Sequence, residues 1–305
     1  MASPQLAQVL EHLRGLAARP TTPGDIAEAR RRVSDYCAVA AITSTSVAAV
    51  KAFDIAGLQA EWLLPDGVDA SRRLLYIHGG AWSAGDPDSH RGLTSRIARA
   101  SGMAVLAIHY RLIPEHPFPA GLDDCVHAYR WLRDNGPLGA SPAQAVFIAG
   151  DSAGGNLTLA TLLACKARGI PLPAAAVPLS PATDFLGTGE SYRTRAEADP
   201  IIKTTPEMMA MLAQLYTQGR ADARDPRVSP LYGELAGLPP LLLQVGDAEV
   251  LRDDSTMFAD RARAAGVDVT LEVWPEMPHV WQLFGGFLPE ADAAIERIAA
   301  FLRVH

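Results

Sequence analysis

A serine flanked by glycines is the residue of this sequence best placed to act as a nucleophile. The segment Gly150–Gly154 reads GDSAG and lies between the apolar run AVFIA and the helix-forming stretch NLTLATLLACKA. A serine in a sharp strand-to-helix turn holds its hydroxyl clear of the backbone, and the glycines let strand and helix approach without Cβ clashes. The segment lacks the Lys-Ser/Thr ending of a phosphate loop and the G-x-G-x-x-G of a dinucleotide site. We therefore predict that Ser152 is a nucleophile for acyl transfer.

A serine hydroxyl needs a base to remove its proton, and in this kind of arrangement the acid and then the histidine follow the serine. Of the 8 histidines, His279 and His305 follow Ser152. His305 stands last in the sequence, where chain ends tend to fray. His279 comes just after the apolar run VTLEVW, in a position to present an imidazole at the end of a strand. The sequence therefore predicts His279 as the base.

The carboxylate that would orient this histidine should follow the apolar run LLLQV. Four residues qualify by position: Asp247, Glu249, Asp253 and Asp254. Asp253 and Asp254 stand where a helix would begin, so capping and stabilisation of the helix dipole are the roles expected of them. From the residues alone, Asp247 and Glu249 both remain candidates.

Two consecutive glycines after another apolar run are candidates to supply N–H donors for an oxyanion. His78-Gly79-Gly80-Ala81-Trp82 follows directly on LLYI. Glycines at the end of a strand free their N–H groups to point at one spot, which is what the oxyanion of a tetrahedral intermediate requires. We predict that the N–H groups of Gly79, Gly80 and Ala153 form this oxyanion hole.

Short apolar runs that alternate with helical stretches must position these residues. Helical patterns occupy 118–134, 154–168, 253–265 and 289–303. The runs that read as buried strands are Leu74–His78, Met103–Tyr110, Ala145–Ala149, Ala174–Leu179, Leu241–Val245 and Val269–Trp274. Strands alternating with helices predict an α/β fold with a mostly parallel sheet covered on both faces.

Two segments fall outside this alternation. Residues 3–18 have an apolar helical face, and a second helix is expected from Pro23 to about Val39. The crossover between the runs ending at Leu179 and starting at Leu241 has about sixty residues, where a dozen or more suffice. It contains methionines and leucines at helical spacing, and Met-rich surfaces suit adaptable pockets. We therefore expect residues 1–45 and an insertion near 185–225 to roof the site as a cap on a catalytic domain of residues 46–305.

The composition limits the classes of partner. The 305 residues carry a net charge of −7, from 27 basic and 34 acidic residues, without a dense basic cluster, so nucleic acid is not expected to bind. The three cysteines, Cys37, Cys125 and Cys165, share no close spacing, which favours reduced thiols in a cytoplasmic protein. Charged residues interrupt the first twenty residues, so no export signal is expected, and no uncharged stretch reaches the roughly eighteen residues of a membrane span. No H-E-x-x-H or C-x-x-C spacing predicts a metal site.

Taken together, the motifs resemble a known family. His78–Ala81, YRLIPEHPFPA at 110–120, GDSAGG at 150–155, EVLRDD at 249–254 and PHVW at 278–281 are similar to those of the bacterial hormone-sensitive-lipase-like esterases. The resemblance runs from about residue 55 to residue 305. It implies an α/β-hydrolase fold with a helical cap, and a carboxylesterase that acts on short to medium acyl chains without a cofactor.

The resemblance also implies roles for individual residues. Ser152 and His279 carry over as nucleophile and base, and the oxyanion donors carry over as named above. Aligning EVLRDD on the family's acid-Pro-Leu-Arg-Asp pattern selects Glu249 as the acid rather than Asp247. The acid loop is one residue longer than usual in the family, and Ala81 replaces the more common third glycine.

Three further residues near these motifs are interpreted as structural. Tyr110 and Glu115 are expected in the scaffold or the pocket wall, and His78 is expected to anchor the glycine loop. The same triad would serve a lactonase or an amide deacetylase, and loss of activity would leave a ligand-binding protein on the same scaffold. The sequence leaves the oligomeric state open, a homodimer included.

Overall fold

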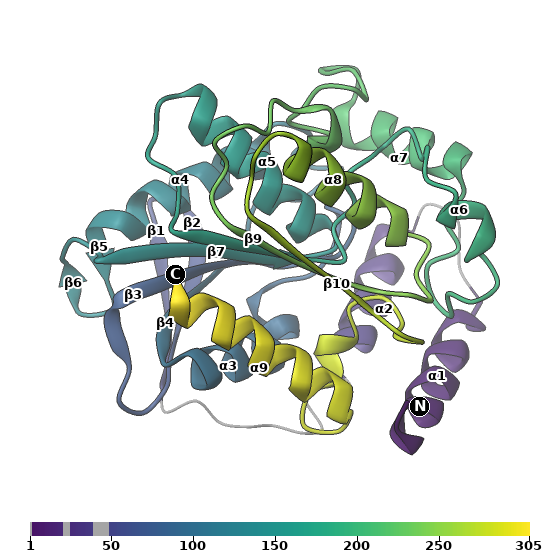
Figure 1. Cartoon of the computed structure of the whole chain (residues 1–305), viewed down its shortest axis with the longest axis horizontal. Helices are drawn as coiled ribbons and strands as arrows, with labels where there is room; N and C mark the ends of the chain where they lie inside the picture. The colour runs from purple at the N-terminus through teal and green to yellow at the C-terminus, as the bar shows by residue number, and fades with distance from the viewer. Residues whose placement is uncertain (1, 21–24, 39–48) are drawn as a thin grey trace.

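The computed structural model describes residues 2–20, 25–38 and 49–305 (Figure 1). The described residues form an eight-stranded sheet in the order β1-β2-β4-β3-β7-β8-β9-β10, in which β1 and β2 are antiparallel to their neighbours and the other strands are parallel. The strands are β1 (Ala49–Ile55), β2 (Leu58–Leu64), β3 (Asp69–Ile77), β4 (Met103–Ile108), β7 (Ala145–Asp151), β8 (Ala175–Leu179), β9 (Leu241–Gly246) and β10 (Val269–Trp274). A two-stranded ribbon, β5 (Asn135–Gly136) with β6 (Gly139–Ala140), lies apart from this sheet.

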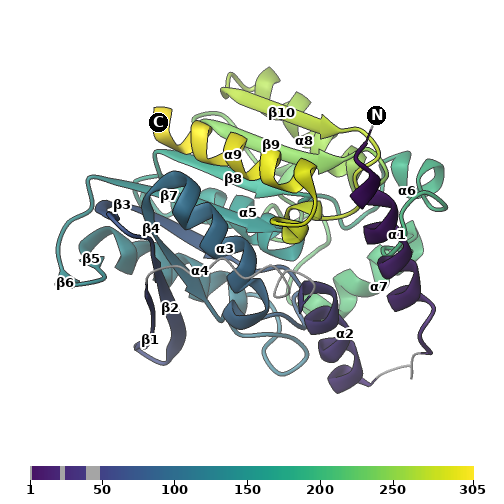
Figure 2. The same ribbon diagram turned by 90° about the horizontal axis from the view of Figure 1, so that it is seen from below.

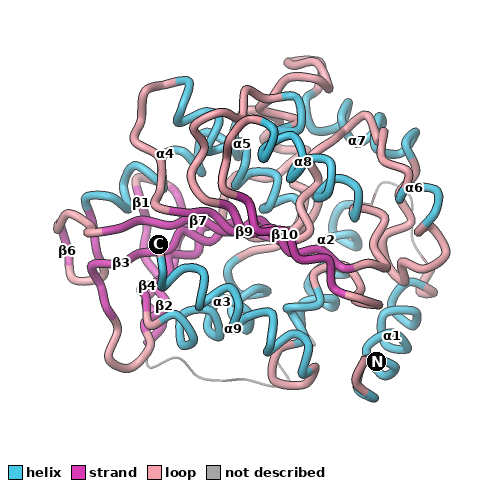
Figure 3. The backbone as a smooth tube through the Cα atoms, viewed as in Figure 1, coloured by secondary structure: helices cyan, strands magenta, loops and turns pink. Residues whose placement is uncertain are grey.

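Helices cover both faces of the sheet, as the alternating pattern predicts (Figures 2 and 3). α4 (Ala120–Asp134), α5 (Ala153–Ala167) and α8 (Arg252–Ala264) pack on one face, and α3 (Pro87–Ser101) and α9 (Pro289–Val304) on the other. β3 shows why the core has two halves, because successive side chains of a strand point to opposite faces. Leu75 and Ile77 join the cluster under α4, α5 and α8, whereas Leu74 and Tyr76 join the cluster under α3 and α9.

The edge of the sheet differs from the expectation. All six apolar runs form strands, but the antiparallel pair β1 and β2 was not predicted. The two strands are joined by Ala56 and Gly57, which both have positive φ angles (51° and 94°). β1 pairs with another strand along one edge only, and several of its side chains are exposed, so it lacks the continuous apolar run of a buried strand.

The amino-terminal helices lie beside the carboxyl ends of the parallel strands (Figures 1 and 2). α1 (Pro4–Ala17) buries Leu6, Val9, Leu13 and Leu16 against Trp281, Phe284 and Leu288. α2 (Ile26–Ala38) follows; residues 23, 24 and 39 of the expected helix, residues 39–48 around the expected domain boundary, and the side chain of Cys37 lie outside the described residues.

The long crossover between β8 and β9 holds α6 (Ser191–Thr194) and α7 (Pro206–Thr217). The helical spacing was predicted correctly, but Met208 and Met211 are exposed, and α7 packs on the body through Met209, Ala213 and Tyr216. No helix in the described ranges has both the length and the apolar character needed to cross a membrane.

Candidate active site

Ser152 occupies a strained turn between β7, which ends at Asp151, and α5, which begins at Ala153. Its backbone has φ 55° and ψ −117°, a conformation that residues with a side chain rarely adopt. A Cβ on Gly154 would lie 2.0 Å from the carbonyl oxygen of Ile77, and one on Gly150 would lie 2.5 Å from the same oxygen. The turn therefore brings β7, α5 and the end of β3 closer together than any other residue would allow at these two positions.

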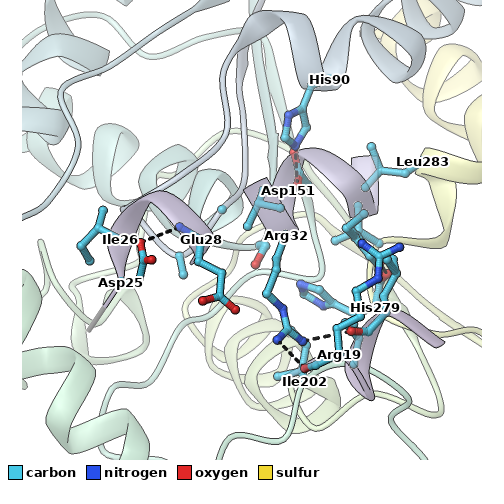
Figure 4. Close-up of a pocket in the computed structure, with 18 residues that line it drawn as sticks. Arg19, Asp25, Ile26, Glu28, Arg32, His90, Asp151, Ile202, His279 and Leu283 are labelled. Atoms are coloured by element: carbon cyan, nitrogen blue, oxygen red, sulfur yellow. Dashed lines mark hydrogen bonds and ion pairs between the residues drawn. The ribbon is translucent and has the colours of Figure 1, made fainter. Parts of the chain in front are cut away.

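A cavity of about 460 Å³ joins this turn to the predicted base. Ser152 and His279 both line it (Figure 4). Aliphatic side chains form much of the remaining wall: Leu16, Ile26, Val33, Ile201, Ile202, Val280 and Leu283. Charged side chains of α2 and of the segment between α1 and α2, among them Arg19 and Glu28, lie on the same wall. The cavity can hold a small molecule with an apolar part beside the serine hydroxyl.

Glu249 contacts the imidazole of His279. Its Oε2 lies 2.7 Å from Nδ1 of His279, and both side chains are almost completely buried. The other carboxylate oxygen, Oε1, accepts hydrogen bonds from Ser180 Oγ at 2.7 Å and from the Gly246 N–H at 2.6 Å. A carboxylate that accepts from Nδ1 fixes the proton on that nitrogen and leaves Nε2 free to accept a proton.

Burial and pairing shift the pKa values of Glu249 and His279 in opposite directions. Burial raises the pKa of Glu249, although His279 and the two other donors partly oppose this. Burial alone would lower the pKa of His279, but the charge of Glu249 and its hydrogen bond raise that pKa above its ordinary value. The imidazole is thus more basic than its buried position alone would allow.

The other candidate acids bind elsewhere. Asp247 is partly exposed and forms ion pairs with Arg195 at 3.0 Å and Arg252 at 3.1 Å. Asp253 accepts from the Ser191 N–H at 2.9 Å, which joins α8 to the long crossover.

Asp254 likewise connects α8 to the crossover. Its Oδ2 accepts from the N–H groups of Thr183 at 2.6 Å and Asp184 at 2.9 Å. Both residues belong to the segment that follows β8. The carboxylates of the first turn of α8 therefore hold the crossover in place, a structural role broader than the capping expected from the sequence.

The glycine loop requires a correction to the sequence-based expectation. The N–H of Gly79 donates to Oδ1 of Asp151 at 3.1 Å, so it is not free to face an oxyanion. A Cβ on Gly79 would lie 2.2 Å from Oδ2 of Asp151, which explains the glycine by close approach rather than by anion binding. Gly80 (φ 119°) and Ala81 (φ 53°) line the cavity instead. The loop is thus shifted by one residue relative to the expectation, because a carboxylate distant in sequence already occupies the first N–H group.

Asp151 connects the glycine loop to the serine turn. Besides Gly79, it accepts from Tyr76 Oη at 2.8 Å and lies 3.3 Å from Nε2 of His90. Burial opposes its charge, but His90 and Tyr76 hold the pKa of its carboxyl below the ordinary value. Asp151, the residue before Ser152, therefore stays charged and holds the loop after β3 against the serine turn.

His78, Tyr110 and Glu115 make structural contacts. Nδ1 of His78 lies 2.8 Å from the Gly79 carbonyl oxygen, and its ring stacks on Tyr110 with centroids 4.4 Å apart. Burial, followed by the proximity of His90, lowers the pKa of His78 to about 3, so the ring is neutral. Glu115 forms a two-pronged ion pair with Arg30 of α2.

Two contacts around the histidine were not predicted. Ser180, directly after β8, donates to Glu249, and Tyr36 Oη of α2 donates to the carbonyl oxygen of His279. The position of Ser180 at the end of an apolar run was an available signal, whereas nothing in the sequence near Tyr36 pointed to residue 279. Within the described part of the chain, no group of three or more His, Cys, Asp or Glu side chains is arranged to hold a metal ion.

Comparison with known proteins supplies independent information. A model of the α/β-hydrolase fold matches residues 74–283. An acetyl-hydrolase of Streptomyces hygroscopicus is 49% identical over 244 residues, which cover 80% of this chain and 79% of that protein. An ethyl acetate hydrolase of Pseudomonas putida is 34% identical over 239 residues, which cover 77% and 74% respectively.

Solved structures agree with these relatives. A crystal structure of an esterase from the bacterial hormone-sensitive lipase family superposes with a TM-score of 0.90 and 42% sequence identity, covering 100% of this chain and 99% of the other. The strand order, the serine turn and the buried Glu249–His279 pair accompany this likeness. The chain therefore belongs to the α/β-hydrolase family, among the bacterial hormone-sensitive-lipase-like esterases.

Proposed function

We propose that this chain hydrolyses carboxylic esters, with Ser152 as nucleophile, His279 as base and Glu249 as the acid that orients it. The observation that carries the proposal is the 2.7 Å contact between Glu249 and His279, beside a cavity that His279 shares with Ser152. The names of the acetyl-hydrolase and ethyl acetate hydrolase relatives support the same chemistry.

The proposed reaction uses side chains and backbone N–H groups of this chain together with water. Nε2 of His279 takes the proton of Ser152 Oγ as Oγ attacks the carbonyl carbon of the ester, and the carbonyl π electrons move onto the carbonyl oxygen. The N–H groups of Gly80, Ala81 and Ala153 are the donors that we propose for this oxyanion. The oxyanion collapses, the ester C–O bond breaks, and the alcohol leaves with the proton from His279. A water molecule then attacks the acyl-enzyme through the same steps, and the carboxylic acid product leaves as Ser152 Oγ regains its proton from His279.

The lining of the cavity supports esters of short to medium acyl chains. Its volume of about 460 Å³ lies near the lower end for pockets that bind small molecules. We further propose that residues 1–45 and the insertion near 185–225 act as its cap. The side chains of Leu16, Ile26 and Val33 from the first part, and of Ile201 and Ile202 from the second, support this division.

Fluorophosphonate labelling and ester hydrolysis test the proposal together. Ser152→Ala should abolish labelling and reduce kcat by a factor on the order of 10⁴–10⁶, while the protein stays folded. Ser141→Ala, at an exposed position, is the matched control and should keep both activities. Turnover by Ser152→Ala at a near wild-type rate would exclude the proposed nucleophile. A panel of aryl esters, lactones and acetamides separates an esterase from a lactonase or a deacetylase, and labelling separates all three from a non-catalytic binder.

Two finer proposals concern the setting of the protein. Cys125 and Cys165 are buried and unpaired, which supports a reducing, cytoplasmic location. Sedimentation or light scattering of the purified chain would distinguish a monomer from the homodimer that the sequence leaves open.

A further inference from the structure

We propose that α2 positions the catalytic groups: Tyr36 holds the loop that carries His279, and Arg30 holds the loop that carries the oxyanion donors. The inference rests on the proposed function. Neither side chain touches the reacting atoms in the mechanism above. Tyr36 acts through the backbone of His279, and Arg30 acts through the backbone of Ser83.

Tyr36 binds the backbone of the proposed base. Its hydroxyl donates to the carbonyl oxygen of His279, and its ring packs edge-on against Phe284, with centroids 6.0 Å apart. Val280, the next residue, has a positive φ of 47°, so the chain turns sharply just after the histidine. The Val280 N–H faces Ser180 Oγ at 3.4 Å. Tyr36 therefore fixes one side of a strained turn whose other side is tied to the residue that binds Glu249.

Arg30 binds the loop after β3, in which Gly80 and Ala81 also line the cavity. Its Nε donates to the carbonyl oxygen of Ser83 at 2.8 Å, and one of its terminal nitrogens also reaches the carbonyl oxygen of Ile113 at 3.3 Å. Ser83 in turn donates its N–H to the carbonyl oxygen of Gly80 at 3.1 Å. One chain of hydrogen bonds thus connects α2 to the turn that presents the Gly80 and Ala81 N–H groups.

The spacing of the two residues makes α2 a bridge between these loops. Arg30 and Tyr36 are six positions apart in sequence, which corresponds to about 9 Å along a helix. Val33, midway between them, lines the cavity. A helix is stiff over this length, so a shift of α2 would move both contacts and the cavity wall together. Arrangement of the base and the oxyanion donors is therefore coupled to the docking of the helix that covers the substrate.

If Arg30 acted only through its ion pair with Glu115, removing either residue should have the same effect. Arg30 and Glu115 form a salt bridge, but their side chains are 36% and 52% exposed, and exposed pairs contribute little to stability. If Arg30 acts through Ser83, removing Glu115 should matter much less than removing Arg30. Glu115→Gln therefore separates the positioning role from the ion pair.

Tyr36→Phe is the first variant of the test, since it removes one hydroxyl and keeps the ring. Tyr129→Phe is its matched control, because Tyr129 Oη donates to the carbonyl oxygen of Pro171 at 2.7 Å, remote from the site. We expect Tyr36→Phe to lower kcat on p-nitrophenyl acetate by roughly tenfold to a hundredfold, as misplaced catalytic groups do, with KM within about twofold. The control should change Tm similarly and leave kcat unchanged.

Arg30→Gln is the second variant, with Arg31→Gln, an exposed neighbour on α2, as its control. It should also lower kcat at nearly constant KM and slow fluorophosphonate labelling, whereas Glu115→Gln and Arg31→Gln should not. Losses in Tyr36→Phe or Arg30→Gln no larger than in their controls, or confined to KM, would overturn the inference. If the wild type hydrolyses the ester and Ser152→Ala does not, the proposed function stands. A negative result with the α2 variants then counts against this inference alone.

Discussion

Nδ1 of His279 lies 2.7 Å from Oε2 of Glu249, whereas the carboxylate of Asp247, two residues earlier in the chain, is partly exposed and paired with two arginines. The backbone explains the difference. Gly246 donates its N–H to Glu249, and a Cβ at Gly246 would lie 2.1 Å from the carbonyl oxygen of Met277. The acid loop therefore runs close beneath the histidine loop, and its third residue after the glycine turns inward.

The first prediction separates these two carboxylates. Glu249→Gln should reduce kcat by about 10⁴, because an amide in this position favours the wrong histidine tautomer. Asp247→Asn removes only a partly exposed partner of two arginines and should stay within a few-fold of wild type. Steady-state kinetics of both purified variants decide the matter. A large loss in Asp247→Asn with a nearly silent Glu249→Gln would contradict the assignment.

The second prediction concerns Ser180, which donates to the buried oxygen of Glu249 that His279 does not use. Ser180→Ala leaves that carboxylate with one donor fewer, which disfavours its charged form. We expect kcat/KM near neutral pH to fall by about tenfold. Ser101→Ala, at another buried serine away from the cavity, serves as the control. Equal kinetics for the two variants would show that Gly246 and His279 alone suffice to hold Glu249.

The third prediction is a pH dependence. In the proposed mechanism His279 must be neutral to accept the proton of Ser152, and Glu249 raises the pKa of His279 above the ordinary value of about 6.5. A raised pKa means that the protonated, inactive form persists to higher pH. The acid limb of kcat/KM against pH should therefore lie above about 6.5, with activity lost as pH falls through it. A limb well below that value would show that burial outweighs the carboxylate.

The fourth prediction compares two glycines. Gly79→Ala would force a Cβ to within 2.2 Å of Asp151 Oδ2 and should destabilise the protein by about 1–3 kcal/mol, with a loss of activity. At Gly15, within α1, an added Cβ meets no other heavy atom within 4 Å. Gly15→Ala should therefore stabilise the fold by about 0.5–1 kcal/mol, since alanine favours a helix interior. Thermal unfolding measures both, and equal Tm shifts would contradict the close approach at Gly79.

The sequence predicts the parallel strands well, because buried strands such as β4 consist of continuous apolar residues. It also predicts the serine turn from the local spacing of its glycines, although the atoms that exclude a side chain at Gly150 and Gly154 include the carbonyl oxygen of Ile77, which is distant in sequence. Gly79 illustrates the limit: its N–H is used by Asp151, 72 residues away, and no local pattern reports that pairing. Ser180 and Tyr36 are similar cases, because their partners depend on how separate strands and helices meet in space.

Part of the aliphatic wall of the cavity comes from segments that do not carry the proposed acid and base. Ile26 and Val33 belong to α2, and Ile201 and Ile202 to the crossover, whereas the hydrogen bonds of Glu249 run among residues at the ends of β8, β9 and β10. A combinatorial library at Ile201 and Ile202, which do not belong to α2, would vary the volume and the chirality of the cavity while the contacts of Tyr36 and Arg30 stay in place. At these two crossover positions, selectivity and turnover are separable targets for directed evolution.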